Sequence, residues 1–366
     1  MPRHRQRLRL GAPVSAAAIL AVGLTVHLAP EAPPVPAVRP AVASPPSFRF
    51  AAGGDMGYSP EADGTLRALA ASGAEFALHF GDMAYDQMQP EPAWCRFVQE
   101  RVGAAFPYEL VTGGHDLNEG QGSIDKYAAC LPDRLHSTGT YGKEYFFDYP
   151  AAHPLARVIM ISPSITFPDG QTYDYSRGTP HYQWLRSAID GARAAGTRWV
   201  VVGMARNCIT AGEKHCEIGP DTFNLLVDKR VDLILQGHEH GYERSKQLAT
   251  GPNCPEVTHD AYNAACVTDD GADGVYEKGG GPVIVVAGTL GIALRPMHPR
   301  DTEAPYFVTM MGSNMNPTHG VVKFTVTETD LRAEFIRGAG GTFTDAFTIT
   351  GPPPTSAPAP SPAPAH

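Results

Sequence analysis

The sequence lacks any run of basic residues. Its 366 residues include 29 lysines and arginines against 38 aspartates and glutamates, which gives a formal net charge of −9. A nucleic-acid-binding protein needs a concentrated patch of positive charge to contact phosphates. That footprint is missing, so we expect no nucleic-acid partner. An acidic chain also exerts no long-range attraction on a phosphorylated molecule, and any affinity for phosphate must arise within a local site.

No internal repeat is evident, and no apolar run is long enough to be an obvious membrane span. The apolar stretch from position 14 to 28 has roughly 15 residues, whereas a span takes about 20. It follows four arginines within the first nine residues, the arrangement of a secretion signal. We therefore expect residues 1–29 to be a signal peptide and the protein to be secreted, with no stable span after cleavage. An uncleaved membrane anchor is the alternative.

Proline and alanine dominate residues 30–47 and again residues 351–366. Segments of this composition have almost nothing to bury, so we predict a linker at the first and a disordered tail at the second. Residues 48–350 should form one domain between them. The candidate site residues described below are spread from position 55 to position 240, and they must meet within a single unit.

Cysteine usage is consistent with export. The sequence has six cysteines, an even number, and disulfides are expected in an oxidising compartment. Six cysteines allow about 15 sets of pairs. Proximity along the chain favours Cys95 with Cys130, Cys208 with Cys216, and Cys254 with Cys266.

Five short polar segments, each directly after an apolar run that predicts a buried strand, carry the chemistry of this chain. Carboxylates and imidazoles that converge from neighbouring strand ends can bind metal ions, because oxygen and nitrogen ligands must approach a metal from several directions at about 2.0 to 2.2 Å. The pattern therefore predicts a metal-dependent hydrolase. The five segments are Gly54–Gly57, Gly81–Tyr85, Gly113–Asp116, Val202–Arg206 and Gly237–His240.

This ordered set resembles the calcineurin-like metallophosphoesterase superfamily, and within it the purple acid phosphatase branch. That branch is marked by Asp-x-Gly in the first segment, here beginning at Asp55, and by a tyrosine three residues after the second aspartate, here Asp82 and Tyr85. The resemblance covers roughly residues 48 to 349. It implies a mixed α+β and α/β fold, a four-layer sandwich of two mixed β-sheets flanked by helices.

The resemblance also implies a set of metal ligands. The first ion would be held by Asp55, Asp82, Tyr85 and His240. Asp82 would bridge to a second ion, which His238 would also bind. Because a phenolate ligand suits ferric iron, we expect iron at the first position. A second ion, whether Zn, Mn or Fe, is not the default expectation.

Two ligands of the family's second metal are missing. Gly114 stands where the pattern has an asparagine, and Ala205 stands where it has a histidine. Neither side chain can coordinate a metal, and even the loss of a group that only supports a ligand typically costs about 10 to 100-fold in affinity or activity. We therefore favour a single metal. Alternatively, water could complete a weak second site, or Asn118, Asn207 or His215 could supply a ligand.

His115 remains beside the missing asparagine. The resemblance implies that His115 contacts the scissile phosphate and protonates the leaving oxygen, while Asp116 orients its ring. A bound metal would lower the pKa of a water towards about 7 and polarise a phosphoryl oxygen. The sequence thus predicts a secreted metal-dependent phosphoric ester hydrolase of the acid phosphatase type, acting on a small phosphate ester. The alternative is a non-catalytic or repurposed protein of this fold that binds a phosphorylated ligand.

Helices and strands alternate between the ligand segments, and strands dominate after position 279. We expect the loop from 118 to 141 and the segment from 254 to 280 to lie at the mouth of the pocket. The predicted helices are 60–71, 91–102, 181–194 and 221–228. The predicted strands are 48–52, 76–80, 110–112, 199–202, 231–235, 283–287, 321–326, 331–335 and 343–349.

Overall fold

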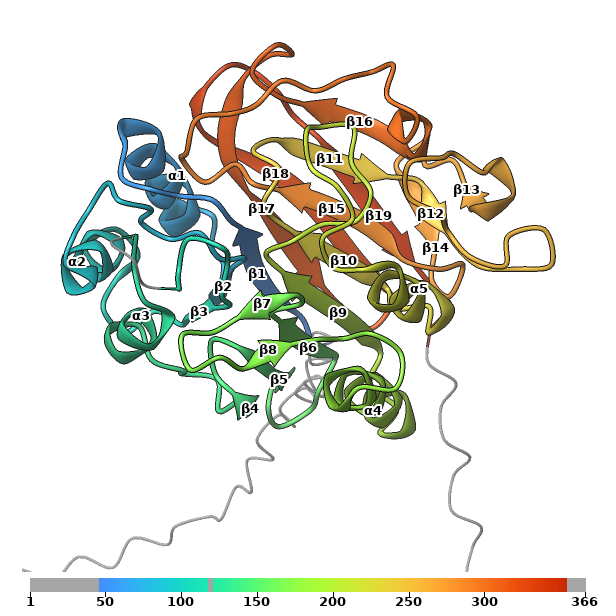
Figure 1. Cartoon of the computed structure of the whole chain (residues 1–366), viewed down its shortest axis with the longest axis horizontal. Helices are drawn as coiled ribbons and strands as arrows, with labels where there is room; N and C mark the ends of the chain where they lie inside the picture. Colours follow the sequence, from blue (N-terminus) through green and yellow to red (C-terminus); the bar gives the residue numbers. More distant parts are fainter. Residues whose placement is uncertain (1–45, 118–120, 354–366) are drawn as a thin grey trace, which may run out of the picture. The chain divides into compact units, whose positions relative to one another are not determined.

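Two large β-sheets and five α-helices make up residues 46–117 and 121–353, the part of the chain that the computed structural model describes (Figure 1). The predicted signal peptide and the greater parts of the linker and tail lie outside the described residues. None of the described helices combines the length and the apolar character needed to cross a bilayer.

The first sheet has seven strands and carries the first two ligand segments. Strand β1 pairs in parallel with β2 and antiparallel with β17, so the sheet is mixed. Its spatial order is β14 (Val275–Glu277), β19 (Ala346–Thr350), β18 (Asp330–Gly340), β17 (Thr318–Val326), β1 (Phe48–Gly53), β2 (Phe76–His79) and β3 (Tyr108–Leu110).

The second sheet has eight strands and is also mixed. Its four central strands are parallel, and antiparallel strands extend it on both sides. The order is β16 (Phe307–Met311), β11 (Tyr242–Ser245), β15 (Val283–Ala287), β10 (Leu233–Gln236), β9 (Trp199–Met204), β6 (Ala156–Ile161), β5 (Glu144–Tyr149) and β4 (Thr138–Thr140). Two small ribbons pair β7 (Ile165–Thr166) with β8 (Thr172–Tyr173), and β12 (Gln247–Leu248) with β13 (Val267–Asp269).

Alternation along the central strands produces two separate apolar layers. Along β9, Trp199 and Val201 join Phe50 of β1 in a cluster made from both sheets. Val202 and Met204, which point the other way, belong to a second cluster that includes helix residues. A strand that is apolar on both faces must be covered on both faces. The four-layer sandwich predicted from the sequence is therefore confirmed.

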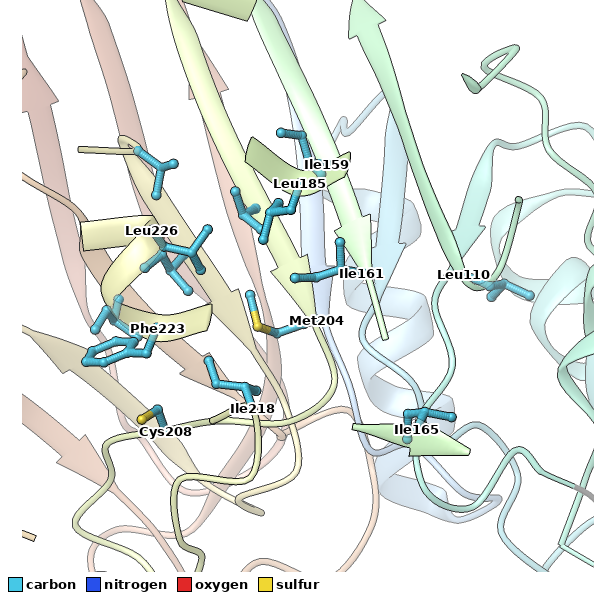
Figure 2. Close-up of a cluster of buried hydrophobic side chains, with 14 of the residues drawn as sticks. Leu110, Ile159, Ile161, Ile165, Leu185, Met204, Cys208, Ile218, Phe223 and Leu226 are labelled. Atoms are coloured by element: carbon cyan, nitrogen blue, oxygen red, sulfur yellow. The ribbon is translucent and has the colours of Figure 1, made fainter. Parts of the chain in front are cut away.

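Helices cover the outer faces of the two sheets. Helix α1 packs against β17 and β18 of the first sheet. On the second sheet, Figure 2 shows Leu185 of α4 and Leu226 of α5 on the same face of the sheet as Ile161 and Met204. The helices are α1 (Pro60–Ala71), α2 (Glu91–Val102), α3 (Ile124–Cys130), α4 (Pro180–Ala194) and α5 (Pro220–Asp228), with short 3₁₀ turns η1 (Ala264–Cys266) and η2 (Ala304–Tyr306).

The helix starts follow from local chemistry. Ser59 precedes α1, and its hydroxyl accepts a hydrogen bond from the amide of Ala62. Thr179 caps α4 in the same way, with Pro180 as its first residue. Proline is favoured at this position because its missing N–H would have no partner there, so α4 and α5 each begin one residue earlier than predicted.

Several predicted elements need correction. The segment from 118 to 141 contains α3 and β4 as well as loop, and β3 ends at Leu110 rather than extending to position 112. The last strand begins at Ala346, three residues later than predicted. Strands β5, β6, β11 and β16 were not predicted.

All three predicted disulfides are present. Cys95 of α2 is bonded to Cys130 at the end of α3. The pair Cys208 and Cys216 closes a short loop after β9, and Cys254 is bonded to Cys266. All six cysteines are paired.

Candidate metal and phosphate site

The predicted ligands lie where strands of the two sheets end close together. Asp55 follows β1 and Asp82 follows β2, both in the first sheet. His238 and His240 follow β10 in the second sheet, and β1 contacts β10. The amide of His238 donates to Asp55 Oδ2 at 2.8 Å. The structure therefore brings the first and last ligand segments into direct contact.

Four of these residues have a left-handed backbone. The φ angles are 62° at Asp55, 55° at Asp82, 53° at Tyr85 and 69° at His238. For a residue with a side chain this conformation costs roughly 1 to 2 kcal/mol, and it persists only where surrounding contacts enforce it. Such strain concentrates at functional sites, and here it turns several side chains toward one point.

Glycines make room for the two carboxylates. A Cβ on Gly113 would collide with the carboxylate of Asp82, and one on Gly237 or Gly288 would collide with that of Asp55. These contacts explain why glycine stands beside the charged residues in the ligand segments. Without side chains at these positions, backbone and carboxylate approach closely.

Three donor atoms form a compact triangle suited to one metal ion. Tyr85 Oη lies 3.1 Å from Asp55 Oδ1 and 3.2 Å from His240 Nε2. The third side, from His240 Nε2 to Asp55 Oδ1, measures 3.4 Å. Ligands about 2.0 to 2.2 Å from a common ion are separated by distances of this size. These three donors therefore fit the first metal of the predicted ligand set.

The orientation of His240 supports this assignment. Its Nδ1 lies 3.1 Å from the carbonyl oxygen of Ala293, which can only accept, so Nδ1 carries the proton. The lone pair of Nε2 is then directed at Asp55 and Tyr85. A metal-binding histidine typically donates its other ring N–H to a carbonyl or carboxylate in this way.

The phenol of Tyr85 is an essential part of the candidate. Within residues 46–117 and 121–353, no group of three or more histidine, cysteine, aspartate and glutamate side chains is arranged to hold a metal by itself. Burial, and then the charges of Asp55 and Asp82, raise the pKa of Tyr85 well above its usual value. Ionisation of this phenol therefore needs a nearby cation.

His238 faces a carboxylate on each side. Its Nδ1 lies 3.9 Å from Asp82 Oδ2, and its Nε2 lies 2.7 Å from Glu217 Oε1. Burial opposes protonation of His238, but the two carboxylates outweigh it and raise its pKa to about 9. Burial likewise opposes ionisation of Asp82, yet His238 and the amide of His115 lower its pKa.

Glu217 is a site residue that sequence reasoning missed. Its other oxygen, Oε2, lies 3.4 Å from Arg206 Nε, so the chain Arg206, Glu217, His238 and Asp82 alternates in charge. The available signal was its position directly after Cys216, in a loop closed at the end of β9. No motif pointed to it.

The second metal position lacks the expected donors. Ala205 is buried directly after β9, and in the described part of the chain no heavy atom beyond Gly114 and its two chain neighbours lies within 4 Å of the point where a Cβ on Gly114 would stand. Of the three proposed substitutes, His215 is exposed, and Asn118 lies outside the described residues. Asn207 is fully buried, and neither of its amide atoms has a hydrogen-bond partner in the described part of the chain.

The ring of His115 lies beside Tyr85, whereas the carboxylate of Asp116 is directed at the backbone. The ring of His115 packs against that of Tyr85 at a tilt of 42°, with centroids 4.4 Å apart, and its Nδ1 lies 2.9 Å from Gln121 Oε1. Gln121, which was not predicted, therefore orients the ring and leaves Nε2 to exchange a proton. The carboxylate of Asp116 instead accepts from the backbone amides of Asp82, Met83 and Gly113. The predicted contact from Asp116 to the His115 ring is wrong, because these amides occupy the carboxylate.

Comparison with known proteins identifies relatives that match more than half of the chain. The model of the calcineurin-like phosphoesterase family matches residues 48–242. Among curated proteins, "Probable purple acid phosphatase 20" of Arabidopsis thaliana is 25% identical over 221 residues, which cover 56% of this chain and 49% of that protein. "Fe(3+)-Zn(2+) purple acid phosphatase 12" of the same plant is 22% identical over 246 residues, covering 62% and 48%. The chain thus spans about half the length of the curated relatives it matches.

Two solved structures share the fold. The purple acid phosphatase PPD1 from yellow lupin (Lupinus luteus) seeds has a TM-score of 0.60 at 17% identity, covering 87% of this chain and 58% of that one. GAP50, the anchor in the inner membrane complex of Plasmodium, has a TM-score of 0.55 at 14% identity, covering 83% and 89%. At these identities the likeness shows the fold alone.

Proposed function

The chain belongs to the calcineurin-like phosphoesterase family, with purple acid phosphatases as relatives, and from this premise we propose that it hydrolyses small phosphate esters with one tightly bound metal ion. The observation that carries this proposal is the triangle of donors made by Asp55, Tyr85 and His240. Iron is the proposed ion, because a phenolate is a ligand suited to the ferric state.

The count of one metal rests on the side chains present around His238. Gly114 and Ala205 provide no donor. The ring of His238 already lies between Asp82 and Glu217, and Arg206 adds a fixed positive charge beside Glu217. The positive charges of His238 and Arg206 would thus occupy the region where relatives hold a second metal ion. They can attract a phosphate, but they cannot replace the ligand-binding capacity of a metal.

Each residue has a proposed role. Asp55, Asp82, Tyr85 and His240 would hold the ion, which when bound supplies Lewis acidity and makes water a stronger acid. His115 Nε2 would contact the phosphate and give a proton to the leaving oxygen. Gln121 holds the other nitrogen of that ring and keeps its proton in place.

We also propose that the protein is secreted. The three disulfides support this proposal, since such bonds persist in oxidising compartments. The basic and then apolar start of the sequence supports it as well.

A non-catalytic role is the second candidate. It is favoured by the same two replacements, Gly114 and Ala205, which fall on one metal position. A protein of this kind would retain affinity for a phosphorylated ligand through His115, His238 and Arg206 without turning it over.

Kinetics of an activated phosphate ester separate the two candidates. We expect weak hydrolysis by the wild type, and a loss of about 10²-fold or more in kcat/KM for His115→Ala, the usual size of a general-acid contribution. Gly114→Asn with Ala205→His should raise kcat/KM above either single variant, because each side chain restores one donor. Among the described residues, a Cβ at position 114 meets no atom within 4 Å beyond its chain neighbours, so the first side-chain atom of the new asparagine does not clash.

The opposite outcome is equally clear. If the wild type is as slow as His115→Ala, and the double variant binds a second metal without a gain in rate, the pocket does not perform phosphoryl transfer. Binding of a phosphorylated ligand would then replace catalysis as the proposed function.

A further inference from the structure

A cavity of about 340 Å³ lies at the end of the second sheet opposite to the metal site. Arg198 directly precedes β9, and Lys229 and Arg230 lie shortly before β10, whereas the metal-site residues follow these strands. A six-residue strand such as β9 is roughly 20 Å long at about 3.3 Å per residue. The cavity is therefore separate from the metal site. It is lined by Arg193, Arg198, Lys229, Arg230, Lys278, Gly279 and Pro352, and we refer to it as the basic pocket.

The basic pocket has an excess of positive charge. Asp232, whose side chain is 1% exposed, lies 3.0 Å from Arg193 Nη2 and 2.5 Å from Lys278 Nζ. Asp190 pairs with Lys229 at 2.5 Å. The five basic side chains of the pocket thus face two carboxylates, one of which also pairs with Arg186, and this leaves at least three formal positive charges in excess.

Two arginines account for most of this excess. In the described part of the chain, neither Arg198 nor Arg230 lies within ion-pair distance of a carboxylate. Arg198 Nη2 donates to the carbonyl of Pro352, and Arg230 Nη1 donates to that of Gly279. A guanidinium carries five N–H donors. Most of those donors therefore have no protein acceptor.

The pKa of Lys278 reflects this excess of positive charge. Burial, together with the charges of Arg193 and Arg198, lowers the pKa of Lys278, even though Asp232 opposes this shift. Like charges gathered in a chain of net charge −9 repel one another unless a ligand of opposite charge relieves them.

We propose that the basic pocket binds a diphosphate group, on a small molecule, at a site separate from the metal centre. In a diphosphate ester the terminal phosphoryl group carries a charge of about −1.5 to −2 at neutral pH and the inner group about −1, so the total of roughly −3 matches an excess of three positive charges. The planar forks of Arg198 and Arg230 suit paired phosphate oxygens. The cavity is also within the size range of small-molecule sites, about 300 to 1,000 Å³.

The choice of variants follows from the ion pairs. Arg193 and Lys278 both pair with the buried Asp232, so replacing either would remove one of its two cationic partners and destabilise the fold. Arg198 and Arg230 do not have this role, and Arg198→Gln/Arg230→Gln is the test variant. Arg177→Gln is the matched control, because its side chain is 71% exposed and does not line the pocket.

Calorimetric titration with methylenediphosphonate, which is not hydrolysed, tests the proposal on the full chain with its metal content checked before and after. We expect a binding event that persists in His115→Ala and in Arg177→Gln, in addition to any binding of the diphosphonate at the metal centre. Affinity should fall at least tenfold in Arg198→Gln/Arg230→Gln, while its hydrolysis of phosphate esters stays unchanged. A parallel titration with a nucleoside diphosphate shows whether a larger molecule is preferred over the diphosphate alone.

The proposal is overturned if the double variant binds as tightly as the wild type, or if Arg177→Gln loses as much affinity. Binding that disappears in His115→Ala would assign the event to the metal site and also overturn it. If the glutamine variant does not fold, Arg198→Lys/Arg230→Lys keeps the charges and removes the forks. That variant should bind several-fold more weakly, and unchanged affinity in it would contradict the role of the two guanidinium groups.

Discussion

Among the single residues, Tyr85 is the one on which the proposed choice of iron depends. Its hydroxyl contacts both Asp55 and His240, and its ring packs against that of His115. Burial and the nearby carboxylates raise its pKa, so the phenol stays protonated unless a cation stands beside it. A ferric ion would satisfy this requirement and would give the protein a colour.

We predict that the purified protein has a visible charge-transfer band and that Tyr85→Phe abolishes it. The variant should remain folded, because only the hydroxyl is removed and the ring still packs on His115. Tyr58→Phe is the control, since Tyr58 is 47% exposed and its ring packs against Phe97 rather than against a proposed ligand. Absorption spectra measure the effect. A band that persists in Tyr85→Phe would show that the phenol is not a ligand.

The predictable site residues share one property, which is that each directly follows a strongly apolar strand. Asp55, Asp82 and His238 could be placed in this way, because the strands that they follow, β1, β2 and β10, end close together in the fold. Glu217 and Gln121 could not, since their positions depend on a disulfide-closed loop and on a turn near α3. The Asp116 prediction failed because adjacency in sequence does not say whether a carboxylate faces a ring or a backbone.

Among the structural elements, the loop from 205 to 217 supports the site. Its disulfide joins Cys208 to Cys216, directly before Glu217. The carboxylates of three buried glutamates outside the loop accept hydrogen bonds from its backbone amides. The amides of Glu213 and Lys214 donate to Glu239, that of Ala211 to Glu243, and that of Thr210 to Glu303. The loop therefore positions the carboxylate that holds His238.

Removal of the Cys208–Cys216 bond should reduce activity by more than the loss of folding stability accounts for. For Cys208→Ala/Cys216→Ala we expect a loss of about 2 to 3 kcal/mol in unfolding free energy, from the entropy of a short closed loop. We also expect a fall of about 10 to 100-fold in kcat/KM, because Glu217 no longer fixes the His238 ring. Cys254→Ala/Cys266→Ala is the control for a disulfide remote from the ligands. Equal losses of activity in both variants would refute a positioning role for the loop.

Glu243 makes the free energy of unfolding depend on pH. Burial, against hydrogen bonds from Thr210 and Ala211, raises its pKa to about 8 from an ordinary 4.5. The folded state thus keeps a proton that the unfolded state releases. The resulting contribution to stability is complete below pH 4.5 and is lost as the pH rises towards 8, by up to about 1.4 kcal/mol per pH unit.

Glu243→Gln should therefore flatten the pH profile of stability. The amide can accept from Ala211 and donate to Thr210, so both contacts survive without a titrating group. Urea unfolding at pH 5.5 and 7.5 measures the change. Glu334→Gln, whose side chain is 55% exposed, should keep the wild-type slope. The same slope in Glu243→Gln would rule out Glu243 as its source.

Most elements could be predicted, and the exceptions have physical reasons. The apolar runs of β1, β9 and β10 stand out because both faces of these strands are buried. Strand β6 is equally apolar, but no polar segment follows it to mark its role. Short α3 has only seven residues and is held by the Cys95–Cys130 bond, so local pattern alone is too weak to show it.

In the molecule as a whole, positively charged side chains are concentrated in two places although the net charge is negative. The chain has a net charge of −9, yet positive groups gather near His238 and in the basic pocket. Any attraction of phosphate must therefore be local, as predicted from the composition. The sequence could not predict the basic pocket, because its five basic residues come from separate segments that only the fold brings together.

The central claim is that this domain holds one tight metal where its relatives' pattern has two. Elemental analysis of the purified protein after extensive dialysis tests it most directly. We predict about one equivalent per chain, predominantly iron, because one ligand set is complete and the other has lost the donors at Gly114 and Ala205. Two tightly held equivalents, or none, would contradict the account.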